Sequence, residues 1–73
     1  MNPLLIDRLK AETALSFFSN MVEKQQRLIY ARRLEGSFYP TMMDDLRYYG
    51  RLEWQWRCIL AELEEMIERE ALA

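Results

Sequence analysis

The sequence predicts an all-α fold in which two long antiparallel helices form one αα-hairpin. Its strongest punctuation is a single break, Gly36-Ser37-Phe38-Tyr39-Pro40, near the middle of the chain. On either side of this break, apolar residues recur at the 4,3 spacing of a helix face. With 73 residues, the chain has room for one domain. Residues 1–73 are therefore expected to form a helix over about 3–35, a turn over 36–40 and a helix over about 41–72.

The first helix has clear start and stop signals. Asn2 is a favoured N-cap, and Pro3 stands at the first helical position, where its missing N–H costs nothing. Gly36 can take the left-handed conformation that closes a helix. Between them lie two apolar stripes, one of Ala11, Leu15, Phe18, Val22 and Ile29 and one of Ala14, Phe17, Met21 and Leu28. The apolar face is therefore wider than one neighbouring helix needs.

The second helix is expected to begin after Pro40 with a capping box, since Thr41 and Asp44 have its spacing. Gly50 is the only weak helix former inside it. An unbroken 4,3 seam follows, made of Met42, Leu46, Tyr49, Glu53, Trp56, Leu60, Leu63 and Ile67, and it is flanked by Leu52, Ile59 and Met66. This seam is predicted to pack against the first helix.

One polar layer is predicted in the middle of the hairpin. Closing near residue 38 would pair positions whose numbers add to about 77, within the uncertainty of helix ends. Glu53 then lies opposite Lys24 and Gln25, and we expect it to be partly shielded and paired with Lys24 or Arg27. Such a layer fixes register while adding little stability. The alternative is a solvated glutamate at the edge of a loose seam.

Composition indicates how so short a chain is stabilised and which partners it has. Cys58 is the only cysteine and there is no histidine, so neither an internal disulfide nor a typical zinc site is expected. Apolar residues make up 51% of the chain, which suggests that a partner chain or a second copy covers part of its surface. The net charge of -2 argues against nucleic acid. No apolar run approaches a membrane span, no signal peptide is evident, and the lone cysteine favours the cytoplasm.

Catalysis is not expected from this inventory, and neither is a cofactor. The chain has no glycine-rich phosphate loop and no serine or cysteine with an evident base nearby. Glu12, Glu23 and Glu53 are interpreted as solvated or ion-paired, and the acidic C-terminal region as a solubilising end. Cys58, with Arg57 and Arg51 nearby, is either a small packing residue or a reactive thiol. We expect the protein not to be an enzyme.

Trp54 is the main candidate for a contact with another protein. It lies about 160° around the helix from Trp56, so the two cannot share one buried face. Aromatic residues and arginine are enriched at interface hot spots. The alternative is that Trp54 folds over its own helix. The predicted partner-binding residues are Trp54, Arg51, Cys58, Tyr48, Phe17 and Met21.

A long first helix with a basic end, a short turn, and a second helix in which Arg47 precedes Leu52-Glu53 by five residues form a recognisable combination. In these features the chain resembles the small helical-hairpin co-chaperone of type III secretion needle subunits. Where that family carries small apolar residues next, this chain has Trp54-Gln55-Trp56-Arg57. The resemblance implies a cytoplasmic, virulence-associated heterocomplex in which the hairpin binds a helical-repeat chaperone, and the two hold the needle subunit before export.

A second hypothesis is a homodimer. Two hairpins would form a four-helix bundle that acts as a regulator or as a phage-encoded inhibitor of a host protein. A stable dimer of the purified chain favours this hypothesis. A marginal chain that a repeat-protein partner stabilises favours the co-chaperone.

Overall fold

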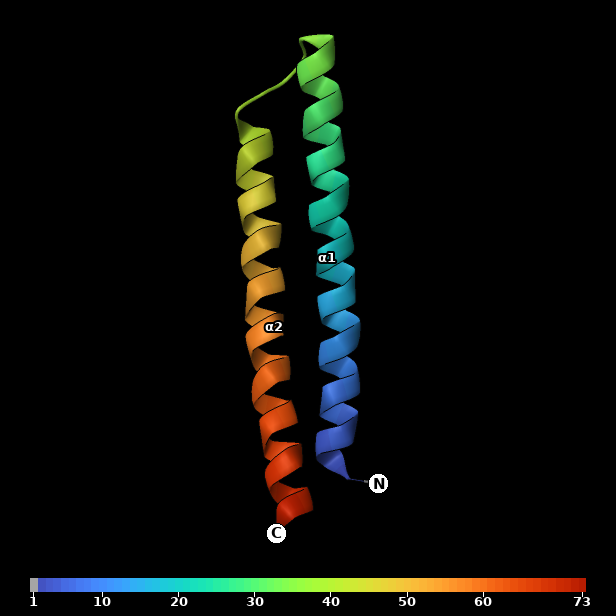
Figure 1. The fold of residues 1–73 in the computed structure, drawn as a ribbon. Coiled ribbons are helices and arrows are strands. Elements are labelled where there is room, and N and C mark those ends of the chain that lie inside the picture. The colour runs from blue at the N-terminus through green and yellow to red at the C-terminus, as the bar shows by residue number, and fades with distance from the viewer. Residues whose placement is uncertain (1) are drawn as a thin grey trace.

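A computed structural model describes residues 2–73 and shows an all-α hairpin (Figure 1). Helix α1 spans Pro3–Glu35 and helix α2 spans Thr41–Leu72, and the two lie side by side in opposite directions. The molecule is a rod measuring 58 × 16 × 13 Å. The predicted fold class is confirmed, and the helix bounds agree with the expected ranges.

The start of α1 is fixed by its cap, as predicted. The Asn2 side chain accepts a hydrogen bond from the Leu4 N–H at 2.9 Å, and Pro3 occupies the first helical position. The Asn2 amide also donates to the Glu70 carboxylate at 3.0 Å. One residue therefore caps α1 and ties the start of the chain to the end of α2.

The end of α1 is closed by Gly36, whose φ of 75° is the left-handed conformation that glycine adopts without strain. The Ser37 N–H donates to the Arg32 carbonyl at 2.9 Å and the Gly36 N–H donates to the Arg33 carbonyl at 3.3 Å. These two bonds are those of a Schellman motif. The Arg33 guanidinium also stacks on the Phe38 ring, 4.8 Å from its centroid, which holds the turn against α1.

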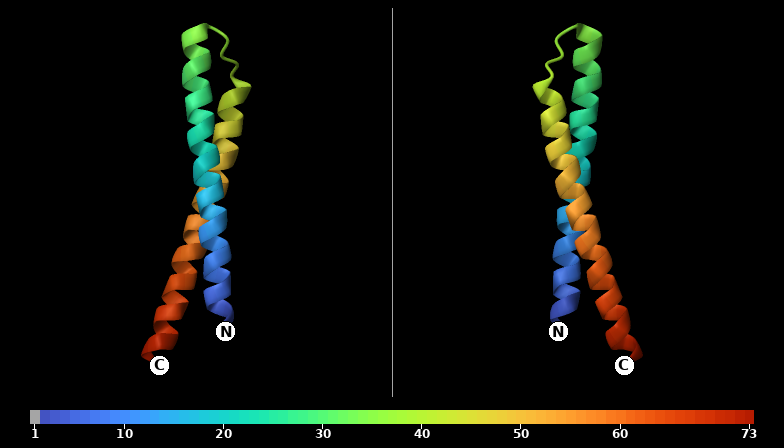
Figure 2. Two further views of the ribbon diagram at one scale, coloured as in Figure 1. Left: turned by 90° about the vertical axis from the view of Figure 1, so that its right-hand side faces the viewer. Right: turned by 90° about the vertical axis from the view of Figure 1, so that its left-hand side faces the viewer.

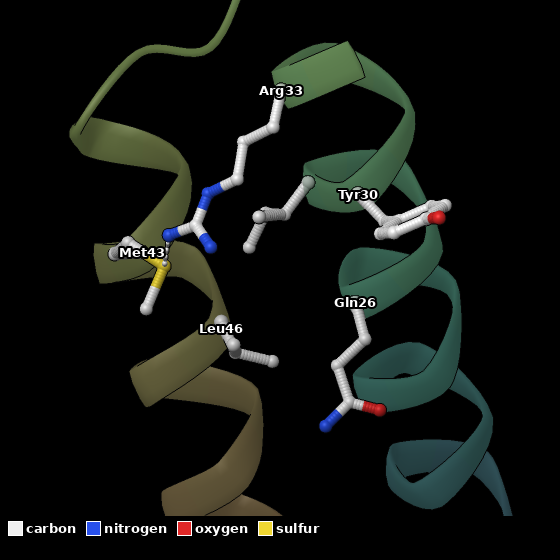
Figure 3. A pocket seen from close by; sticks show the side chains of 6 residues that line it. Gln26, Tyr30, Arg33, Met43 and Leu46 are labelled. Atoms are coloured by element: carbon white, nitrogen blue, oxygen red, sulfur yellow. Dashed lines mark hydrogen bonds between the residues drawn. The ribbon is translucent and has the colours of Figure 1, made fainter.

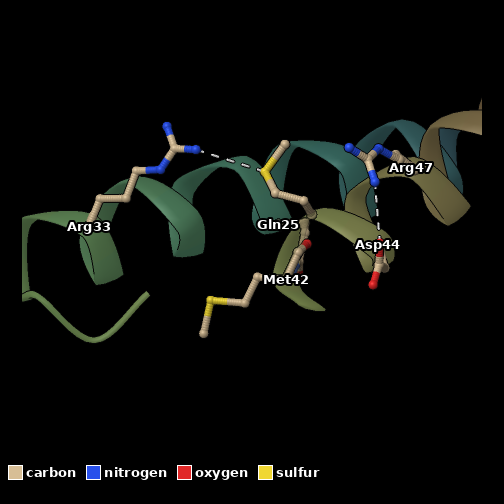
Figure 4. Close-up of polar contacts among 6 residues, drawn as sticks. Gln25, Arg33, Met42, Asp44 and Arg47 are labelled. Carbon is tan, nitrogen blue, oxygen red and sulfur yellow. Dashed lines mark hydrogen bonds and ion pairs between the residues drawn. The ribbon is translucent and has the colours of Figure 1, made fainter. Parts of the chain in front are cut away.

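The predicted capping box of α2 is wrong. Pro40, with φ −55° and ψ −29°, is already helical, and its carbonyl accepts from the Met43 N–H at 3.0 Å. Thr41 therefore lies inside the first turn, and no side chain caps the helix. Asp44 forms an ion pair with Arg47 at 3.3 Å instead (Figure 4).

The contact between the helices follows the predicted stripes. Every residue of the predicted α2 seam is half-buried, as are Leu15, Phe18 and Val22 of the predicted α1 stripe. Among residues 2–73, only Ala11 and Ile29 are buried, with exposed fractions of 0% and 6%. Figure 2 shows that the helices cross at a shallow angle near the middle of the rod and lie farther apart toward both ends. The core is therefore a single thin seam.

The register of α1 against α2 differs from the expected one because the turn does not join the two helices at the same height. In Figure 1 the connection runs back alongside α1, so that α2 begins well below the end of α1. The Gln25 side chain accordingly donates to the carbonyl of Met42, in the first turn of α2, at 3.0 Å. Gln25 thus lies beside the start of α2 and not opposite Glu53.

We expect the two glycines to respond oppositely to alanine. A Cβ at Gly50 would meet nothing within 4 Å, so Gly50→Ala should add up to about 1 kcal/mol of stability through helix propensity. At Gly36 the space is also open, but the positive φ makes alanine strained, so Gly36→Ala should cost about 1 kcal/mol. Thermal melting followed by circular dichroism at one protein concentration measures both. A loss of stability in Gly50→Ala would contradict the open environment.

Candidate protein-binding surface

One edge of the hairpin carries a shallow groove near the turn. Arg33 reaches across from α1, and its guanidinium lies 4.0 Å from the sulfur of Met43 on α2 (Figure 3). The groove has a volume of about 260 Å³ and is lined by Gln26, Ile29, Tyr30, Arg33, Met43 and Leu46. It identifies the residues of each helix that face this edge.

The opposite edge carries apolar side chains on both helices. In an antiparallel pair, residues that flank the seam on one side of α1 meet those that flank it on the corresponding side of α2. Because Gln26, Arg33 and Met43 mark the groove edge, the residues on the other side of each seam share the second edge. We call it the apolar edge, and its members are Ala14, Phe17, Met21 and Leu28 of α1 and Tyr48, Leu52, Ile59 and Met66 of α2.

The large side chains of the apolar edge are open to solvent. Phe17, Leu28, Tyr48, Ile59 and Met66 have exposed fractions between 40% and 59%. Each exposed ring is held by a seam ring: Phe17 meets Phe18 edge-on at 5.2 Å, and Tyr48 meets Tyr49 at 5.7 Å. Exposed apolar side chains that include rigid aromatic rings are typical of a protein-binding site.

The predicted partner-binding residues do not form one surface. Phe17, Met21 and Tyr48 lie on the apolar edge. Trp54, at 64% exposed, lies toward the groove edge. Arg51 and the free thiol of Cys58 are exposed on the outer side of α2, away from the seam. Trp54 and the half-buried Trp56 lie on different faces of α2, and Trp54 lies across the hairpin from the apolar edge.

The predicted contacts of the polar layer are replaced by others. Glu53 is half-buried in the seam, but its carboxylate pairs with Arg57 of its own helix at 3.9 Å. Arg27 forms an ion pair with Glu23, and Lys24 is exposed. The backward path of the turn is the physical reason, because it moves Glu53 along α1 toward the N-terminus and away from Lys24. Figure 4 shows Gln25 beside Met42 instead.

The role of Glu53 in fixing the register of α1 against α2 remains a prediction. It is the only charged residue of the α2 seam, and a polar seam residue disfavours alternative pairings by the cost of desolvating it. Glu53→Leu should therefore give mixed association states in sedimentation velocity, whereas Glu68→Leu, at an exposed position off the apolar edge, should not. A single unchanged species in Glu53→Leu would rule out the register role.

Charge is unevenly distributed along the rod. The terminal half, residues 2–19 and 57–73, holds seven acidic and four basic side chains, a formal charge of −3. The turn half, residues 20–56, holds five acidic and six basic side chains, a formal charge of +1. The acidic residues of the terminal half are Asp7, Glu12, Glu62, Glu64, Glu65, Glu68 and Glu70. The rod is therefore polarised from one end to the other.

Little else in the described chain points to chemistry. No group of three or more His, Cys, Asp or Glu residues within residues 2–73 is arranged to hold a metal ion. Over the same residues, neither helix has an apolar stretch long enough to cross a membrane. The apolar edge is the surface with the clearest potential role.

Comparison with known proteins gives no relative. No protein-family model matches the chain, and no curated protein or solved structure is significantly similar to it.

Proposed function

We propose that the protein is a non-enzymatic binding module whose apolar edge packs against helices of another protein. In line with its resemblance to needle-subunit co-chaperones, we propose that the partner is a cytoplasmic helical-repeat chaperone of a type III secretion system. The complex would hold the needle subunit before export. The hairpin contributes a ready-made pair of helices, which is a common way to cover an amphipathic helical partner.

The observation that carries this proposal is the imbalance between buried and exposed apolar surface. Two of the described side chains are buried in a hairpin 58 Å long, while five large side chains of the apolar edge remain 40–59% exposed. Burying apolar surface contributes about 25 cal/mol per Å². A partner that covers the edge therefore stabilises the hairpin and has its own apolar face covered in return.

The test is reconstitution with a needle subunit and its helical-repeat chaperone. Sedimentation velocity of the mixed proteins should show a ternary complex. Phe17→Glu, on the apolar edge, should raise the dissociation constant at least about tenfold, since it buries a charge in place of an aromatic anchor.

The matched control is Leu34→Glu, which changes an exposed leucine of the same helix away from the apolar edge. It should leave the affinity unchanged. Absence of a complex would contradict the co-chaperone role, and equal binding by Phe17→Glu would contradict the assignment of the surface.

A further inference from the structure

We infer that, when no other protein occupies the apolar edge, a second copy of this chain covers it, with the two hairpins antiparallel and their turns at opposite ends. This inference rests on the apolar edge of the proposed function and adds its occupant in the free protein. The product is a four-helix bundle with two-fold symmetry, in which the same residues face each other on both copies.

One long side of the rod has the dimensions of a standard interface. Taken as a flat face from the extents of 58 × 16 × 13 Å, this whole side measures about 800 Å² in projection, close to the roughly 800 Å² per partner that a standard interface buries. The apolar residues also straddle the middle of the rod. Phe17 and Met21 lie on either side of the midpoint of α1, and Leu52 and Ile59 lie on either side of the midpoint of α2. A two-fold axis through the middle therefore superimposes the two apolar edges along their length.

Charge selects the antiparallel orientation. If both turns lay at the same end, the two terminal halves, each with a formal charge of −3, would lie side by side and repel. In the antiparallel arrangement each terminal half lies against the turn half of the other copy, which has a formal charge of +1. The orientation follows from the sign of these interactions.

Self-association has a consequence for binding. The dimer covers the edge that a partner protein needs, so the monomer is the form that binds. Dissociation then precedes complex formation, and high concentrations of the chain reduce its apparent affinity for the partner.

The first experiment measures orientation. A single nitroxide is attached at Leu72→Cys in a Cys58→Ser background. The distance between labels is measured by pulsed electron resonance at about 50 μM protein, well above a micromolar dissociation constant. Antiparallel hairpins place the two labels about 50 Å apart, near the length of the rod, whereas parallel hairpins place them within about 25 Å. The short distance, or the absence of a dimer, would overturn the inference.

The second experiment measures the dimer dissociation constant of the unmodified protein as the salt concentration is raised. Raising NaCl from about 20 to about 300 mM screens charge, so the antiparallel dimer should weaken severalfold, while a parallel dimer would tighten.

Ile59→Glu should raise the dimer dissociation constant about tenfold or more, and Leu9→Glu, exposed and off the apolar edge, should not. Equal effects of the two variants would contradict the interface.

Different results contradict the dimer and the co-chaperone role. A chain that stays monomeric but binds the repeat chaperone through Phe17 refutes the dimer and leaves the binding module intact. A salt-weakened antiparallel dimer that binds no repeat chaperone or needle subunit supports the dimer and refutes the co-chaperone.

Discussion

Replacing Ile29 by alanine should largely unfold the protein under conditions where the native chain is folded. Ile29, with 6% of its surface exposed, is the only large side chain within residues 2–73 that is buried, and it lies in the seam between α1 and the first turns of α2. Removing its three outer carbons costs about 2–5 kcal/mol in a packed core. This loss is comparable to the whole free energy of unfolding, because small domains are stable by only a few kcal/mol in total.

Urea denaturation followed by circular dichroism measures the loss, with protein concentration held fixed because association contributes to stability. Leu34→Ala removes a similar aliphatic side chain from a position of α1 that is 73% exposed, and it should change stability by less than about 0.5 kcal/mol. Similar losses in the two variants would show that Ile29 is not buried in the seam.

Enlarging Ala11 should be the second most damaging change. Ala11 has no exposed surface, so the added atoms of Ala11→Leu have no room unless the helices move apart. Overpacking of this kind costs about 1–3 kcal/mol. In a hairpin whose helices cross and separate toward both ends (Figure 2), moving them apart at Ala11 also weakens the contacts beyond it, including the hydrogen bond between Asn2 and Glu70.

The control is Ala31→Leu, since Ala31 is exposed on the same helix. It should be neutral within about 0.5 kcal/mol. Equilibrium denaturation of the two variants side by side gives the comparison. A neutral or stabilising Ala11→Leu would mean that the helices leave a cavity at Ala11.

The seam was predictable because its cause is local and periodic. The 4,3 spacing from Met42 to Ile67 specifies one face of α2 wherever its partner lies, and all eight of its residues are half-buried. The cap at Asn2 and the left-handed Gly36 are likewise decided by one or two residues and their immediate neighbours.

The errors arose where the outcome depends on how the chain turns in space. Thr41 and Asp44 have the spacing of a capping box, but Pro40 starts the helix one residue earlier and removes the geometry that the box needs. The path of residues 37–39 along α1 shifts the register, and with it Glu53 loses the neighbours predicted for it. Neither effect is encoded in the periodicity.

The two sets of residues that form the apolar edge were visible separately in the sequence. Its α1 members were evident as a second stripe, and Leu52, Ile59 and Met66 were evident as residues flanking the seam of α2. Antiparallel packing brings these two sets to the same side, and that step requires a rule about helix pairs beyond the pattern of either helix. Trp54 is conspicuous in composition, but it lies toward the groove edge.

Hydroxyl-radical footprinting of the methionines is the most direct way to test whether the apolar edge is the binding surface. Thioether oxidation reports whether each methionine side chain is covered. Met21 and Met66 lie on the apolar edge, whereas Met43 lines the groove on the other edge. On assembly, either with a partner protein or with a second copy, Met21 and Met66 should become protected while Met43 oxidises as before. Protection of Met43 without protection of Met21 and Met66 would contradict the claim that the apolar edge is the binding surface.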